Sequence, residues 1–104
     1  MANSILVDWM KAEKITARKV RLILKTGNLG GYPLLKARFM LTIVSSGSSY
    51  TGSYFNITSY TQYNRDWTFS DSVNSWVRWW VQMVRRDTGQ QFYVQEGDRF
   101  YVPM

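Results

Sequence analysis

The predicted fold depends most on residues 70–86, which read SDSVNSWVRWWVQMVRR. Ser70 is a residue type that caps the free amides at the start of a helix, and Asp71 suits the positive end of the helix dipole. Gly89 follows as a stop signal. Apolar residues recur through the stretch at helical spacing, at Val73, Val77, Trp80, Val81 and Val84. We therefore predict one long amphipathic helix over residues 70–86.

The same stretch has more apolar side chains than one side of a helix needs. Trp76, Trp79 and Met83 widen the stripe until only a narrow polar strip remains. One small core has no room for all of these side chains, and apolar residues left outside a core usually mark a protein contact. We predict that Trp76, Trp79 and Met83 form a protein interface, and that the 70–86 helix is a possible site of homodimerisation.

Upstream of this helix, residues 37–60 have the pattern of a β-hairpin. Ala37 to Val44 is rich in Phe, Ile and Leu and alternates between two faces, the odd positions being the predicted core face. A Ser- and Gly-rich turn over residues 45–49 follows, and Tyr50 to Tyr60 is predicted to return as the second strand.

Other segments complete the predicted order of elements. Residues 19–25 alternate apolar and mostly basic side chains, which favours a strand over the alternative, a helix from Thr16 that ends at Gly27. Residues 91–95 and 99–102 read as two strands joined by a turn at Glu96-Gly97-Asp98. Ser4 is a candidate cap for a short helix that ends near Glu13.

These elements predict a single compact α+β domain over residues 1–104. Its architecture is a five-stranded antiparallel sheet or a small OB-like barrel, because the long helix falls between the third and fourth strands. A short N-terminal helix precedes the first strand. An open sheet with one packed helix fits the same order of elements.

Composition excludes several kinds of chemistry. The chain of 104 residues has no Cys and no His, so a disulfide, a thiol or imidazole catalyst and a Cys or His metal site are all excluded. We predict a non-catalytic protein without cofactor or metal. Lack of disulfides, of a signal peptide and of a long apolar segment leads us to expect a cytoplasmic protein with no membrane partner.

Charge and tyrosines together suggest binding of a polyanion. The net charge is +6, and residues 11–38 hold eight of the thirteen basic side chains but one of the seven acidic ones. Proteins that hold single strands combine cations for the phosphates with flat rings on which bases stack. We predict that single-stranded DNA or RNA binds to a surface formed by Lys19, Arg21, Lys25, Lys36, Arg38, Tyr50, Tyr54 and Tyr60.

A second hypothesis belongs to a different class. Small size, no catalytic set and many Tyr and Trp residues also suit an interaction protein of viral or mobile-element type. Such a protein would bind and inhibit a host protein, for example a nucleic-acid-processing or defence enzyme. Tight binding to one protein, with little affinity for free nucleic acid, would distinguish it from the first hypothesis.

Overall fold

Residues 75–85 form a long central strand and not the helix that their apolar pattern predicts. The structure is a computed structural model that describes residues 6–104. In it, β7 (Ser75–Arg85) buries every second side chain up to Met83 and turns the ones between outward. Val and Trp fit a pleated, half-buried surface well, and period two replaces the helical period. The prediction of a helix over residues 70–86 is therefore wrong.

The predicted N-terminal helix is also replaced by a strand. β1 (Val7–Thr16) pairs antiparallel with β2 (Lys19–Thr26), with Met10 opposite Leu24. The predicted capping residue, Ser4, lies outside the described residues. For the ambiguous segment that follows, the strand interpretation of residues 19–25 is confirmed and the alternative helix is not formed.

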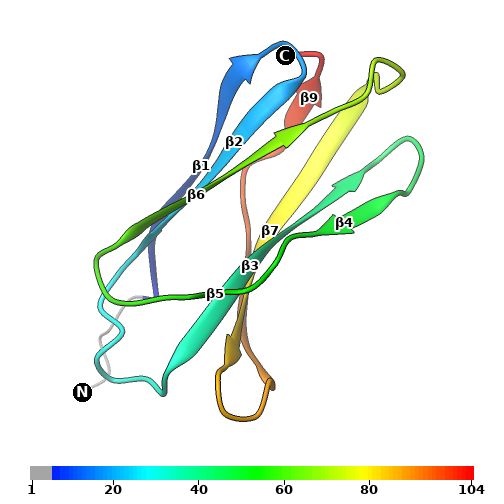
Figure 1. The fold of residues 1–104 in the computed structure, drawn as a ribbon. Helices are drawn as coiled ribbons and strands as arrows, with labels where there is room; N and C mark the ends of the chain where they lie inside the picture. The colour runs from blue at the N-terminus through cyan, green and yellow to red at the C-terminus, as the bar shows by residue number, and fades with distance from the viewer. Residues whose placement is uncertain (1–5) are drawn as a thin grey trace.

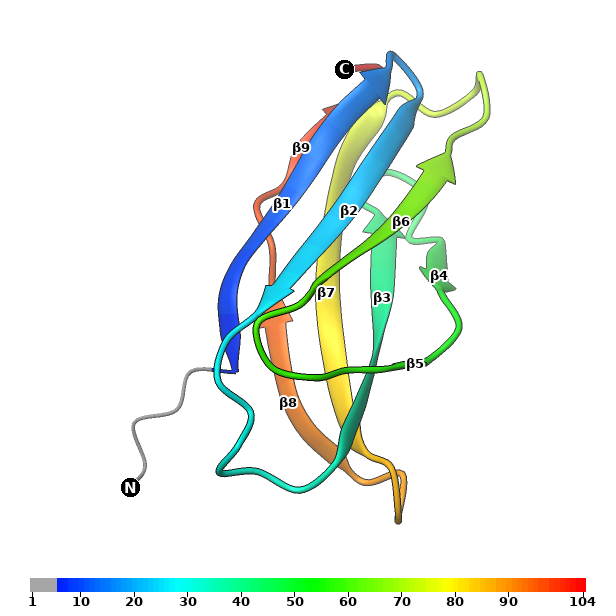
Figure 2. The same cartoon turned by 60° about the vertical axis from the view of Figure 1, so that its left-hand side comes forward.

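The described chain is an all-β sandwich, so the predicted α+β or OB-like architecture is wrong. The remaining strands are β3 (Leu35–Ile43), β4 (Ser49–Thr51), β5 (Phe55–Asn56), β6 (Gln62–Thr68), β8 (Gln91–Glu96) and β9 (Phe100–Val102). One sheet has the order β1-β2-β6, and the other has the order β4-β3-β7-β8, in which β5 also pairs with β3 and β9 also pairs with β7. Figures 1 and 2 show the two sheets facing each other. No helix that could span a membrane occurs in residues 6–104.

The predicted hairpin is confirmed for its first strand and only in part for its second. β3 buries its odd positions, as the alternation of residues 37–44 predicts. The return strand is broken into two short pieces, because β4 and β5 pair with β3 but residues 52–54 between them do not continue the ladder. Within this break the Gly52 amide donates to the carbonyl oxygen of Phe39, at 2.8 Å. The break leaves an opening along this side of the sandwich, where Gly52 and Ser53 line a pocket.

The last two strands are not partners of each other. β8 pairs with residues 80–84 of β7 and β9 pairs with residues 75–77, so the two follow one another along the same edge. The predicted turn at residues 96–98 is therefore a break between collinear strands and not a hairpin. At this break the Gly97 amide donates to the carbonyl oxygen of Trp79, at 2.9 Å.

Trp79 lies at the centre of the core between the sheets. Its side chain is fully buried, its ring centroid lies 6.1 Å from that of Phe39, and its indole Nε1 donates to the carbonyl oxygen of Asp98 at 2.7 Å. A buried indole needs such a partner for its N–H. β2 closes the core from the opposite sheet with Val20, Leu22 and Leu24.

Candidate interaction surfaces

The predicted basic residues lie on two opposite faces of the sandwich. On β2, Lys19, Arg21 and Lys25 alternate with buried residues and therefore point away from the core on the outside of the β1-β2-β6 sheet. Lys36 and Arg38 point outward from β3, on the outside of the other sheet. Because two packed sheets lie between the groups, these cations do not form one surface.

An acidic neighbour partly neutralises the β2 group. Asp66 of β6 accepts from Arg21 Nε at 2.8 Å and from Arg21 Nη2 at 3.2 Å, and Lys19 Nζ lies 3.8 Å from the same carboxylate. The hydrogen bond from Arg21 is the main reason that the pKa of Asp66 is lowered, with the charges of Arg21 and Lys19 adding to it. Lys25 has no carboxylate within ion-pair distance among the described residues.

This pairing predicts a pH-dependent effect of Asp66→Asn. The carboxyl pKa is lower in the folded state than in the unfolded one, so the ionised form stabilises the fold at neutral pH. That contribution is lost as the pH falls from the ordinary carboxyl pKa through the lowered one. We expect the variant to melt below the wild type at neutral pH, by a small margin for an exposed pair, and the two melting temperatures to converge in acid. A gap that persists in acid would contradict this account.

The three predicted tyrosines occupy three different environments. Tyr50 on β4 stacks at a tilt on Trp67, with centroids 5.2 Å apart. Tyr54, in the break between β4 and β5, has Lys36 Nζ 4.8 Å and the Arg38 guanidinium carbon 4.6 Å from its ring centroid. Tyr60 is exposed in the loop before β6 and adopts a positive φ of 54°. Only Tyr54 therefore lies with predicted cations, namely the pair from β3.

Of the predicted interface residues, Trp76 alone is accessible. It is 52% exposed, whereas Trp79 and Met83 are fully buried in the core. The reason is the strand geometry of β7, because Trp79 and Met83 are an odd number of residues from Trp76 and point to the other face. The residues that share the outer face with Trp76 are instead Arg78, Trp80 and Gln82.

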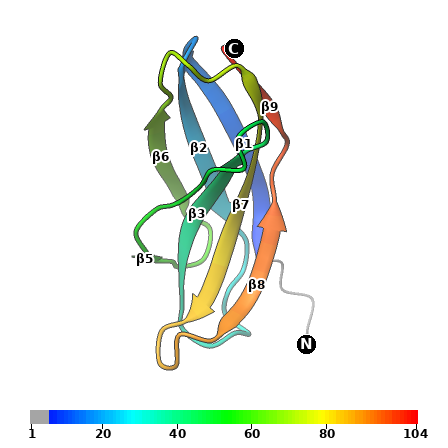
Figure 3. The same ribbon diagram turned by 90° about the vertical axis from the view of Figure 1, so that its right-hand side faces the viewer.

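An apolar surface crosses the outside of the β3-β7-β8 sheet. Figure 3 shows the strands of this sheet in front of β1 and β2. We call this surface the outer apolar face. Trp80 lies opposite Met40 on β3, while Trp76 and Tyr101 of β9 meet edge to face with centroids 5.6 Å apart. A hollow of about 450 Å³ lies here, with Met40, Trp80 and Val94 among its lining residues. The outer apolar face comprises Met40, Trp76, Trp80, Val94 and Tyr101.

Cations lie around the outer apolar face. The Arg78 guanidinium is 4.9 Å from the ring of Trp80 and is held by two hydrogen bonds of 3.0 Å to Glu96. Lys36 and Arg38 have no carboxylate within ion-pair distance among the described residues, and Arg38 Nε donates instead to Gln82 Oε1 at 2.7 Å. The rim at this end of the face is therefore positively charged and unneutralised.

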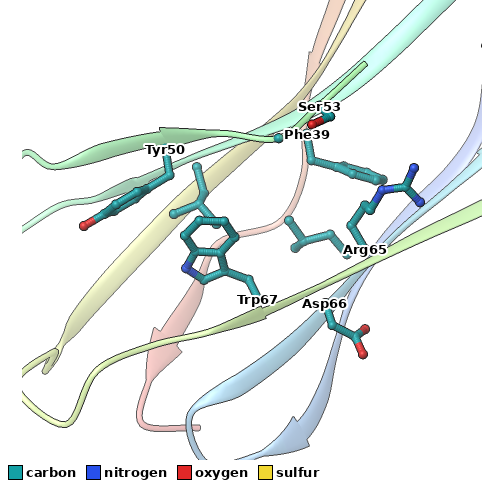
Figure 4. A pocket seen from close by; sticks show the side chains of 9 residues that line it. Phe39, Tyr50, Ser53, Arg65, Asp66 and Trp67 are labelled. Carbon is teal, nitrogen blue, oxygen red and sulfur yellow. The ribbon is translucent and has the colours of Figure 1, made fainter. Parts of the chain in front are cut away.

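A second candidate surface is a pocket of about 130 Å³ between the sheets. It opens between β6 and the break at residues 52–54. Figure 4 shows Trp67 and Tyr50 on one side of the pocket, Phe39 and Arg65 on the other, and the Asp66 carboxylate directed away from it. Leu22 and Leu41 complete its apolar lining. Its main polar group is the Arg65 guanidinium, which lies 4.6 Å from the ring of Phe55.

Sequence reasoning missed most of these residues. The alternation of Tyr63 and Trp67 with polar neighbours is the signal that could have identified β6 and the pocket. The outer apolar face could have been found only by treating residues 75–85 as a strand. Across residues 6–104, no three His, Cys, Asp or Glu side chains gather in a way that could hold a metal ion.

Comparison with known proteins adds no assignment. No family model, no curated protein and no solved structure matches this chain.

Proposed function

We propose that this chain is a non-catalytic protein-interaction domain that binds its partner through the outer apolar face. The main observation is that Trp76, Trp80 and Tyr101 lie on the outside of a sheet whose other side already forms the core. Trp76 and Tyr101 are exposed and in contact with each other, and Trp80 is half-buried on the same face. Exposed aromatic clusters of this kind commonly mark protein contacts, and Trp and Tyr are enriched among residues that dominate binding energy.

The charges around the face indicate the chemistry of the partner. Lys36 and Arg38 border the apolar residues without acidic partners in the described chain, and the whole protein carries +6. Complementary charge speeds association and selects among partners. We propose a protein partner whose contact surface has an apolar centre and carboxylates on the side that meets β3.

The arrangement of rings favours a protein over a single-stranded nucleic acid. Base stacking needs open ring faces beside a continuous row of cations. Here Lys36 and Arg38 lie over the ring of Tyr54, and Arg78 lies over Trp80. The remaining predicted cations, on β2, are on the opposite side of the sandwich. These features support the interaction hypothesis more than the nucleic-acid hypothesis.

Trp76→Ser tests the proposal, with Trp9→Ser as its matched control. Trp9 is 40% exposed on the outside of the other sheet, so the two variants lose the same side chain at similar exposure from opposite faces. The partner is first captured from nuclease-treated lysate of the source cells, identified, purified and titrated. Loss of an exposed Trp from the contact surface should weaken binding by about thirtyfold, as expected of a residue worth ~2 kcal/mol. Trp9→Ser should bind as the wild type does.

Two results would contradict the proposal. One is equal affinity of the Trp76→Ser variant and the wild type for the purified partner, with both proteins shown to be folded by circular dichroism. The other is complete loss of capture after nuclease treatment, together with salt-sensitive binding of the pure protein to a thymidine oligonucleotide. That second result would favour the nucleic-acid hypothesis instead.

A further inference from the structure

The free edge of β6 lies directly beside the pocket between the sheets. Among the described residues, β6 pairs with β2 and with no other strand. Thr26 N donates to Thr61 O and Phe69 N donates to Arg18 O, so the odd residues of this segment direct their backbone groups toward β2. In an antiparallel ladder the even residues then direct theirs away from it. Residues 62, 64, 66 and 68 therefore direct their N–H and C=O groups to an edge that no strand covers in the described chain, and of these groups the Asn64 carbonyl oxygen accepts from the Arg65 side chain.

The side chains at this edge separate into two environments. The side chains of the odd-numbered residues point toward the space between the sheets, and two of them, Arg65 and Trp67, line the pocket. The even residues point to the outside of the sheet. A strand added beside β6 would place every second side chain over the pocket, because side chains alternate along it with the same period.

The pocket has the size and chemistry to accept one such side chain. An apolar cavity of about 150 Å³ can hold a benzene ring, and this pocket measures about 130 Å³. Phe39, Leu41 and Trp67 supply apolar walls. Leu, Ile or Phe are therefore the residue types that fit.

Arg65 gives the pocket a preference for a partner segment that carries negative charge. Its guanidinium Nη1 donates to the carbonyl oxygen of its neighbour Asn64 at 2.7 Å, and no carboxylate lies within ion-pair distance of it in residues 6–104. Because Asn64 directs its N–H and C=O groups away from β2, this contact occupies one of the carbonyl oxygens at the free edge. A partner that brings a carboxylate to Arg65 would exchange a neutral acceptor for a charged one, which makes a stronger hydrogen bond.

From these observations we infer that the β6 edge binds an extended, acidic segment of a partner polypeptide as an added β-strand, with one large apolar side chain in the pocket. Backbone hydrogen bonds to the even residues of β6 supply affinity, and the pocket with Arg65 supplies specificity, as in other cases of strand addition. Leu41 and Tyr50 line both the pocket and the hollow on the outer apolar face, but the β6 edge and Arg65 take no part in that face. The inference can therefore be tested independently of the proposed function.

The test uses a synthetic nine-residue peptide that alternates Thr and Leu between terminal Glu residues, titrated into ¹⁵N-labelled full-length protein. Two further peptides carry N-methyl groups, one on the Thr amides and one on the Leu amides. A strand presents these two sets of amides at opposite edges. We expect the parent peptide to shift the amide signals of residues 62–68, and one methylated peptide to bind at least tenfold more weakly than the other.

Asn64→Pro and Asn64→Thr form the matched pair of protein variants. Proline removes the outward N–H of residue 64 without removing a bond to β2, and prolines are tolerated at strand edges. We expect Asn64→Pro to weaken peptide binding at least tenfold, whereas Asn64→Thr binds as the wild type does. Both variants should keep the melting temperature of the wild type within a few degrees, because the lost N–H is unpaired.

Several outcomes would overturn the inference. Unaltered binding by Asn64→Pro, or equal binding by both methylated peptides, would exclude backbone pairing at this edge. So would a lack of signal shifts at millimolar peptide. Binding of benzene in the pocket without binding of the peptide would instead assign the pocket to small apolar molecules. A dimer of the free protein that Asn64→Pro abolishes would assign the edge to a second copy of the chain.

Discussion

Replacing Gly97 with alanine is expected to destabilise the domain by about 2–3 kcal/mol, the upper range for overpacking of a core. A Cβ atom at this position would overlap Cε2 and Cζ2 of the Trp79 ring. The ring has no free space to move into, because it is fully buried and its Nε1 is bonded to Asp98. The loss is measured as the change in free energy of unfolding from urea titrations.

Gly52→Ala is the control for this substitution. The added Cβ would lie 3.5 Å from the carbonyl oxygen of Phe39, an ordinary contact, so its effect should stay within about 0.5 kcal/mol. A double-mutant cycle with Trp79→Phe isolates the clash, because the smaller ring gives the methyl group room. If Gly97→Ala costs the same free energy beside Phe as beside Trp, the proposed cause is wrong.

Thr26→Val is expected to cost about 2 kcal/mol, although valine has nearly the same shape. The Thr26 hydroxyl is fully buried, donates to the carbonyl oxygen of Thr58 at 2.6 Å and accepts from the amide of Thr61 at 2.9 Å. Valine would leave both of those backbone groups without their partner. Because these contacts join β2 to the loop before β6, we also expect faster amide hydrogen exchange in residues 58–61.

A second threonine provides the comparison for this effect. The Thr42 hydroxyl bonds to the Ser49 hydroxyl at 3.0 Å in an exposed position, where water can replace it. Thr42→Val should therefore change stability by less than about 0.5 kcal/mol. Equal losses of stability for the two valine variants would show that the buried hydroxyl has no special role.

The sequence predicts strands well where one periodicity dominates. In β3 the apolar residues at odd positions alternate mostly with basic or polar ones, so period two is clear and the buried positions follow from it. β2 alternates in the same way except at Ile23, which is also buried, so the sequence alone leaves a helix as an alternative for that segment. In β7 the residues between the buried positions include Trp76 and Trp80, so a helical stripe fits as well as an alternating one. Pairing with a neighbouring strand decides between the helical and the alternating period in this segment, since β3 pairs along nearly the whole of β7.

The candidate interaction surfaces could not be predicted fully, because they depend on which strands pair over long distances in the sequence. The position of Lys36 and Arg38 opposite the β2 cations follows from the assignment of β2 and β3 to different sheets. No local pattern encodes that assignment. The pocket likewise needs Trp67 from β6 beside Tyr50 from β4, and the two strands are in different sheets. Trp76 was identified as an exposed contact residue from its apolar neighbourhood alone, and its role as such remains a prediction.

The pairing of β3 with β7 has a consequence for how fast the chain reaches its native state. These central strands are separated by residues 44–74, and that intervening segment contributes β6 to the opposite sheet. Closing so long a loop costs entropy before its contacts are gained. The domain should therefore refold over milliseconds to seconds, as sandwiches dominated by non-local pairing do, and not in microseconds as small helical proteins can.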